Sequence, residues 1–115
     1  MNRTALAKVA ARMVRLEVGI VSQDENIKAA EADNRENDVH HHRGIRTEYN
    51  CELIGISETL HDLGFRYEGA PPFLTGWYFG NHVQGAVAEH PDEPDQAIAD
   101  VLDRLIELAP GEVKR

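Results

Sequence analysis

The sequence predicts a helix-rich α+β domain: a long N-terminal amphipathic helix, two further helices and a small antiparallel sheet. Apolar residues recur at helical spacing in three segments, and they alternate at strand spacing between residues 65 and 90. The 115 residues, 42% of them hydrophobic, provide for one core, so we expect a single domain over 1–115. Within it, we expect a helix over 1–32, a polar His-rich loop over 33–44 and a compact α+β core over 45–109.

The chain is acidic, which limits the ligands that it is expected to bind. Twenty Asp and Glu residues outnumber twelve Lys and Arg residues, giving a formal net charge of −8. Because such a field repels polyanions, no direct nucleic-acid binding is expected. The apolar stretches are too short to cross a bilayer, and no signal peptide is recognisable. The single cysteine, Cys51, cannot form an internal disulfide, so we expect a reducing, cytoplasmic location.

The N-terminal helix carries a heptad pattern, in which apolar residues step alternately by three and four positions. Val14, Val18 and Val21 lie beside this row and widen the apolar face. Gly19 lowers helix propensity, and Ser22 followed by Glu25 matches a capping box, so a break near residue 22 is an alternative to one continuous helix. The face expected to mediate oligomerisation or docking consists of Leu6, Val9, Met13, Leu16 and Ile20.

An external partner for this face is expected because residues 45–108 already hold enough elements for a core. Docking against the chain's own later helices is the alternative.

A second helix is predicted after the polar loop, which ends at Gly44. Thr47 is placed to cap this helix, and Gly64 is expected to end it in the left-handed conformation, with Phe65 making the accompanying apolar contact. The apolar face comprises Tyr49, Leu53, Ile56, Leu60 and Leu63.

Two or three short strands are expected between Phe65 and His90, where the period changes. Val83, Gly85 and Val87 alternate with more polar or smaller neighbours, as in a half-buried strand. A short helix over 82–89 is the alternative.

A final helix begins at an acidic, proline-marked turn around Pro94 and ends before Pro110. The stretch from Gly76 to Leu108, a short sheet followed by an acidic turn and a helix beginning Asp95-Gln-Ala-Ile98, resembles the HicB-type antitoxin fold. The resemblance implies an antitoxin-like regulator as one candidate function.

Two histidine-containing motifs are candidates for metal binding, although a solvated polar surface is expected for both. In an extended loop, His40 and His42 would share a face. Glu58 and His61 have the Glu-x-x-His spacing of di-iron bundles, but such bundles need two copies of this motif. We therefore expect no cofactor, and no stoichiometric zinc or iron at either motif. A di-iron or zinc enzyme or storage protein using Glu58 and His61 is the alternative function.

No nucleophile elbow, dinucleotide-binding motif or phosphate loop occurs, which disfavours an enzyme. We expect a small, acidic, non-enzymatic regulatory protein that binds another protein, one with a basic patch, and that forms a homo-oligomer. An aromatic anchor beside the acidic C-terminal helix would serve such binding. The expected partner surface comprises Trp77, Tyr78, Asp92, Glu93, Asp95, Asp100 and Asp103.

Overall fold

The computed structural model describes residues 2–66 and 75–111, and the described chain folds into helices without a β-sheet. The helices are α1 (Arg3–Ala32), α2 (Glu36–Asp62), α3 (Thr75–Glu89) and α4 (Pro94–Leu108). The predicted α+β class is therefore wrong, and the protein is helical throughout the described part. None of the described helices combines the length and apolar character needed to cross a bilayer.

The predicted N-terminal helix is confirmed, and it runs without a break past Ser22. Asn2 caps α1, its side-chain oxygen accepting hydrogen bonds from the backbone amides of Thr4 at 2.8 Å and Ala5 at 3.3 Å. At the other end Asn34 takes a left-handed φ of 55°, so that the amide of Arg35 donates to the carbonyl of Ala30 at 2.9 Å. This tight turn folds α2 back along α1.

The predicted loop over 33–44 is wrong beyond its first residues, because α2 already begins at Glu36. Glu36 and Asp38 lie in the first turn of α2, where negative charge interacts favourably with the helix dipole. Val39 is buried near the tip of the hairpin, as is Ala30 of α1. One buried apolar side chain, in an otherwise polar stretch, gives too weak a helical period to recognise from sequence.

The strands predicted between Phe65 and His90 are also wrong where the structure describes them, since α3 occupies residues 75–89. Among the α3 residues from 78 onward, whose side chains the structure describes, Phe79, Val83, Ala86 and Val87 are buried, a spacing of four, three and one that fits one face of a helix. The alternating interpretation gave weight to Gly85, which is exposed, and overlooked the burial of Ala86. Residues 67–74 lie outside the described part.

The predictions for the helix ends near residue 64 and for α4 are confirmed. Gly64 has a φ of 102°, and Phe65, almost fully buried, donates its amide to the carbonyl of Leu60 at 3.0 Å. Helix α4 begins with Pro94 at its first turn, as its sequence predicts.

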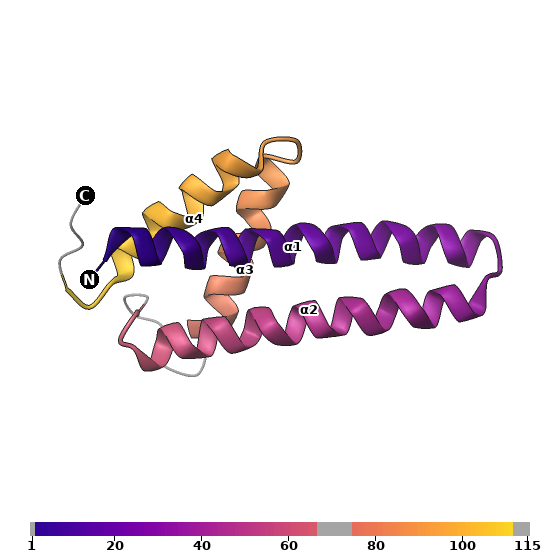
Figure 1. Cartoon of the computed structure of the whole chain (residues 1–115), viewed down its shortest axis with the longest axis horizontal. Coiled ribbons are helices and arrows are strands. Elements are labelled where there is room, and N and C mark those ends of the chain that lie inside the picture. Colours follow the sequence, from indigo (N-terminus) through magenta and orange to yellow (C-terminus); the bar gives the residue numbers. More distant parts are fainter. Residues whose placement is uncertain (1, 67–74, 112–115) are drawn as a thin grey trace.

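The core lies at one end of the elongated molecule, which measures 52 × 29 × 21 Å. Figure 1 shows α1 and α2 as a long antiparallel hairpin, with α3 and α4 packed near the end that holds the N-terminus. The main core cluster contains no residue between Ile20 and Leu53. Residues 21–46 therefore form a distal arm that projects beyond the core. The cluster comprises Leu6, Ala10, Met13, Val14, Leu16, Ile20, Leu53, Leu60, Phe65, Phe79, Val83, Ala86, Val87, Ala97, Val101, Leu102 and Leu105.

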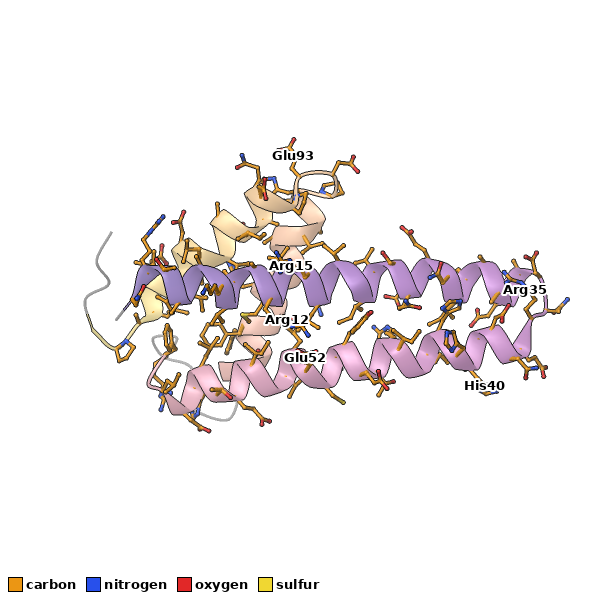
Figure 2. All side chains as sticks on the ribbon, viewed as in Figure 1. Arg12, Arg15, Arg35, His40, Glu52 and Glu93 are labelled. Carbon is orange, nitrogen blue, oxygen red and sulfur yellow. The ribbon has the colours of Figure 1, made fainter. Side chains whose placement is uncertain are left out.

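Polar side chains join the two helices of the distal arm. Arg46 donates to Asp24 at 2.6 Å, and Arg43 donates to Glu31 at 3.1 Å. The ring of His42 hydrogen-bonds the side chain of Gln23 at 2.7 Å. Arg12 and Glu52 make a similar pair between α1 and α2 within the body of the molecule, as Figure 2 shows. Exposed ion pairs of this kind each contribute about 0–1 kcal/mol, so the distal arm is held more weakly than the core.

Gly19 allows close approach of α1 and α2. A Cβ atom at position 19 would lie 2.8 Å from Cε2 and 2.9 Å from Cδ2 of Tyr49, which is closer than real Cβ contacts. The glycine that weakens the helix in isolation is thus needed for packing the Tyr49 ring.

We predict that Gly19→Ala lowers the free energy of unfolding by about 1 kcal/mol, because overpacking outweighs the gain in helix propensity. Gly55→Ala is the matched control in α2, where a Cβ meets nothing within 4 Å. It should stabilise the protein by about 0.5–1 kcal/mol. Urea denaturation measures both; equal stabilisation by the two substitutions would contradict the packing argument.

We also predict that backbone amides of the distal arm exchange with solvent deuterium at least about tenfold faster than those of residues 10–20, because local opening of the arm exposes little apolar surface. Hydrogen-exchange mass spectrometry or NMR measures this difference. Uniform protection along α1 would show that the arm opens only with the core.

Candidate functional site

A groove of about 670 Å³ lies in the corner where the distal arm leaves the core. Parts of the chain far apart in sequence form its walls: the middle of α1, one turn of α2, the end of α3 and the α3–α4 turn. We call it the corner groove. Its lining comprises Glu17, Val18, Ile20, Val21, Ser22, Asp24, Glu25, Arg46, Asn50, Gln84, Val87, Ala88, Pro91 and Asp92.

Two valines give the corner groove an accessible apolar surface. Val18 and Val21 are each 41% exposed, although both are large aliphatic residues in the middle of a helix. Val87, on α3, is buried and contributes further aliphatic surface to the lining. The widened apolar face predicted for α1 therefore exists, but the part that these two valines add is not covered by the core.

Glu17 is the unusual polar residue of the corner groove. Only 6% of its surface is exposed, and its Oε2 atom is buried without a hydrogen-bond partner in the structure. Burial raises the pKa of the Glu17 carboxyl; the positive charge of Arg46 opposes this rise and the negative charge of Asp24 adds to it. A buried acceptor without a donor costs about 1–3 kcal/mol, so the charged form of this carboxyl destabilises the fold.

The charge of the lining is predominantly negative. Four carboxyl groups face one guanidinium, that of Arg46, and Arg46 already donates to Asp24 at 2.6 Å. The other carboxyl groups belong to Glu17, Glu25 and Asp92. The corner groove thus combines an aliphatic surface with an excess of negative charge, which suits a ligand that is both aliphatic and cationic.

The predicted oligomerisation face lies inside the molecule. Leu6, Met13, Leu16 and Ile20 are buried in the core cluster, and Val9 packs against it. Helices α2, α3 and α4 all contact α1 and cover this face. The premise that it lacks a partner within the chain is wrong, so this face gives no argument for a homo-oligomer.

The structure places the residues of the predicted partner surface in different surroundings. Asp92 lines the corner groove, whereas Asp100 is partly buried and lies 4.0 Å from the His82 ring. Tyr78 is partly buried, and the side chain of Trp77 lies outside the described residues. The remaining acidic residues are exposed: Glu93, at the α3–α4 turn in Figure 2, Asp95 and Asp103.

The structure does not bring the predicted metal candidates together. His40 and His42 lie within α2, where residues two apart diverge by about 200° around the axis. His42 is bonded to Gln23 instead. Glu58 is exposed, and the His61 ring lies 3.3 Å from Asp62 rather than facing a second Glu-x-x-His motif within the described chain.

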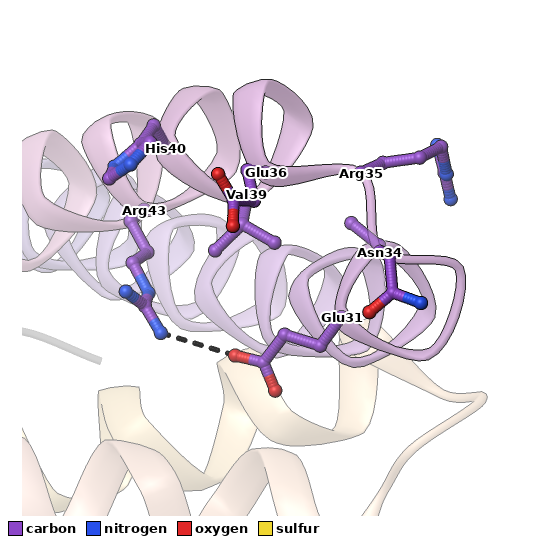
Figure 3. Close-up of a pocket in the computed structure, with 8 residues that line it drawn as sticks. Glu31, Asn34, Arg35, Glu36, Val39, His40 and Arg43 are labelled. Carbon is purple, nitrogen blue, oxygen red and sulfur yellow. Dashed lines mark hydrogen bonds and ion pairs between the residues drawn. The ribbon is translucent and has the colours of Figure 1, made fainter.

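A smaller pocket lies at the tip of the distal arm, where α1 turns into α2 (Figure 3). Both of its guanidinium groups are paired with carboxylates: Arg43 with Glu31 at 3.1 Å, and Arg35 with Asp38 at 2.7 Å. A charged ligand would have to displace these pairs, so this pocket is a weaker candidate than the corner groove.

Sequence reasoning missed Glu17, the central residue of the corner groove. Glu17 lies three positions after Val14 and three before Ile20, both buried, so its place on the buried side of α1 was visible from helical spacing. Arg46 gave no such signal, because its proximity to Glu17 depends on how α2 folds back along α1.

Comparisons with protein-family models, with curated proteins and with solved structures return no match for this chain. We therefore infer function from the geometry and charge of the described residues.

We predict that Glu17→Gln raises the free energy of unfolding at pH 7 by about 1 kcal/mol, because it removes the cost of a buried, unpartnered carboxylate. Burial raises the pKa of Glu17 in the folded state, so its favourable contribution is present at low pH and is lost as pH rises through the folded-state pKa. The variant's advantage should therefore grow with pH. Denaturation at several pH values measures it, with exposed Glu25→Gln as the control; a pH-independent difference contradicts the argument.

Proposed function

We propose that this chain is a small, non-enzymatic regulatory protein that binds another protein, and that the corner groove takes a basic, aliphatic segment of that partner. The observation that carries the proposal is the exposure of Val18 and Val21 in a groove whose charged lining is mostly acidic. Neither feature alone would suffice, since single exposed valines and acidic surfaces are both common.

Aliphatic anchoring would supply the affinity. Val18 and Val21 are one helical turn apart on α1, and each leaves two-fifths of its surface in water. Covering them with a leucine or isoleucine of a partner would contribute about 25 cal/mol for every Å² of apolar surface removed from water. Such an anchor would bind beside the lining residues of α3 and the α3–α4 turn.

Charge would supply selectivity and association rate. Glu25 and Asp92 are both exposed and line the corner groove, the first from α1 and the second from the α3–α4 turn. A lysine or arginine next to the partner's aliphatic anchor would be attracted to both carboxylates and would donate hydrogen bonds to them. An acidic segment would be repelled.

The antitoxin-like alternative loses its support, because the resemblance depended on a short sheet where the structure has α3. The di-iron alternative is not carried forward either, because Glu58 and His61 lack a facing second pair in the described chain. The basic, aliphatic partner proposed for the corner groove depends neither on the antitoxin resemblance nor on the Glu-x-x-His motif.

We predict that a synthetic amphipathic Leu/Lys peptide binds the protein, and that a Leu/Glu peptide of the same pattern does not. In NMR titrations the Lys peptide should shift the resonances of Val18, Val21 and Val87. Val21→Lys should weaken its binding at least about tenfold, equivalent to about 1.4 kcal/mol. Binding should also weaken as salt is added, because the rim charges are exposed.

Ile54→Lys is the matched control, since Ile54 is 48% exposed on α2 and does not line the corner groove. It should leave the peptide affinity unchanged. Equal weakening by Ile54→Lys, or equal binding of the Leu/Glu peptide, would show that the peptide does not recognise the corner groove.

A further inference from the structure

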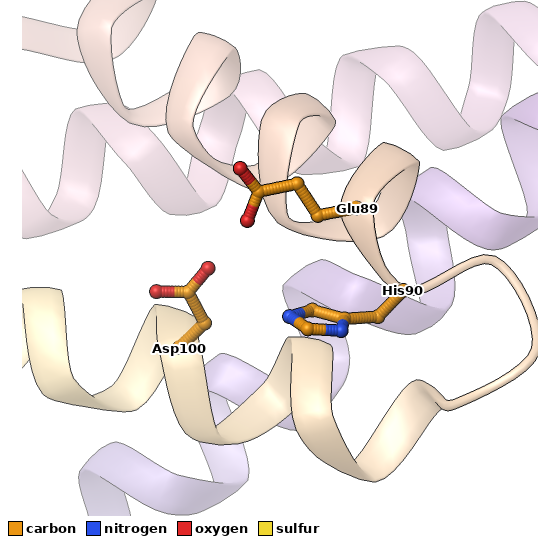
Figure 4. A group of neighbouring side chains, drawn as sticks. All are labelled: Glu89, His90 and Asp100. Atoms are coloured by element: carbon orange, nitrogen blue, oxygen red, sulfur yellow. The ribbon is translucent and has the colours of Figure 1, made fainter.

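A second cluster of chemically reactive side chains lies outside the corner groove, between α3 and α4. It comprises Glu89, His90 and Asp100, whose ligand atoms all lie within 4.8 Å of one another. Figure 4 shows the Glu89 and Asp100 carboxylates and the His90 ring gathered in the space between the end of α3 and the facing side of α4. The two helices therefore hold an imidazole and two carboxylates around a common point.

A second imidazole lies beside one member of this cluster, Asp100. His82 lies two helical turns before Glu89 on α3, so both residues are on one side of that helix. Its Nε2 atom is 4.0 Å from Oδ1 of Asp100, and this atom is buried without a hydrogen-bond partner in the structure. A buried ring nitrogen without a donor or acceptor is unfavourable unless something else binds it.

We propose that His82, Glu89, His90 and Asp100 form a binding site for a divalent transition-metal ion, with Zn²⁺ as the best match. Two imidazole nitrogens and two carboxylate oxygens are ligands that zinc accepts in tetrahedral sites. The two carboxylates neutralise the charge of the ion. The unpartnered Nε2 atom of His82 gains a ligand bond that the protein itself does not provide.

The ligand atoms lie farther apart than they would around a bound ion. Bonds of 2.0–2.2 Å at tetrahedral angles place neighbouring ligand atoms about 3.3–3.6 Å apart. The 4.0 Å between His82 and Asp100 exceeds this by about 0.4–0.7 Å, and separations of up to 4.8 Å among Glu89, His90 and Asp100 exceed it by at most about 1.5 Å, so the side chains must draw together when the ion binds. Glu89 is exposed and is able to turn inward without disturbing the core.

The nature of the ligands separates this ion from the alkaline-earth metals. Mg²⁺ and Ca²⁺ prefer oxygen ligands in larger coordination shells, and neither gains from two imidazoles. The ion would join the end of α3 to the first half of α4 across the short turn that contains Pro91 and Asp92. It would therefore stabilise the docking of α4, and the observations that support the ion site are separate from those that support binding in the corner groove.

Isothermal titration of the untagged full-length protein with Zn²⁺ tests the proposal. We expect one Zn²⁺ per chain, no comparable binding of Mg²⁺, and a rise in Tm of about 5 °C or more when free Zn²⁺ is tenfold above its Kd. Glu89→Gln and Asp100→Asn should each weaken Zn²⁺ binding at least about tenfold. Because Glu89 is exposed, the first substitution should leave the helical circular-dichroism spectrum unchanged.

The histidines of the distal arm provide the control, since consecutive histidines bind metals without a built site. The triple variant His40→Gln, His41→Gln, His42→Gln should keep the one-to-one Zn²⁺ stoichiometry, and so should Asp95→Asn at the start of α4. Loss of binding in the triple variant with retention in Glu89→Gln would overturn the proposal, as would no Zn²⁺ binding by the unsubstituted protein.

Discussion

The apolar face of α1 is the element on which the rest of the structure depends. Six of its residues, from Leu6 to Ile20, belong to the main core cluster, and α2, α3 and α4 all pack against this helix. Figure 1 shows how short α3 and α4 are beside the hairpin, so they cover only the half of α1 that carries this face. Helices α3 and α4 therefore end, along α1, near the point where its buried residues end.

The structure of the rest of the hairpin follows from the position at which the buried face of α1 ends. Beyond Ile20 the two helices contact each other mainly through polar pairs, and only Ala30 and Val39 are buried apolar residues there. The corner between this two-helix arm and the four-helix body is necessarily concave. Val18 and Val21 lie at the boundary between the arm and the body, on a side of α1 that the core does not cover. Because their side chains are apolar and exposed, they are available to a partner.

Elements with a strong local signal were predictable, and elements that depend on tertiary packing were not. The heptad spacing of α1, the proline-marked start of α4 and the left-handed Gly64 each have a local physical cause, and each is confirmed. Val83, Gly85 and Val87 satisfy a strand period as well as Val83, Ala86 and Val87 satisfy a helical one, so only the burial of Ala86 decides between them. The apolar face predicted on α1 exists, but its core residues pack against α2, α3 and α4 of the same chain instead of against another molecule.

Neither the corner groove nor the proposed ion site between α3 and α4 can be recognised from the sequence, and the reason is the same for both. Glu17 and Arg46 come from different helices, as do His82 and Asp100, and each pair meets only after the hairpin and the α3–α4 turn have formed. That turn also connects the two sites, because His90 belongs to the cluster and Pro91 and Asp92 to the groove. Pro91 and Asp92 follow His90 in the chain and line the groove. An ion bound by His90 would restrict these two residues and so reduce the conformational entropy that is lost when a partner binds. By linkage, a partner in the groove would raise the affinity for the ion by the same factor.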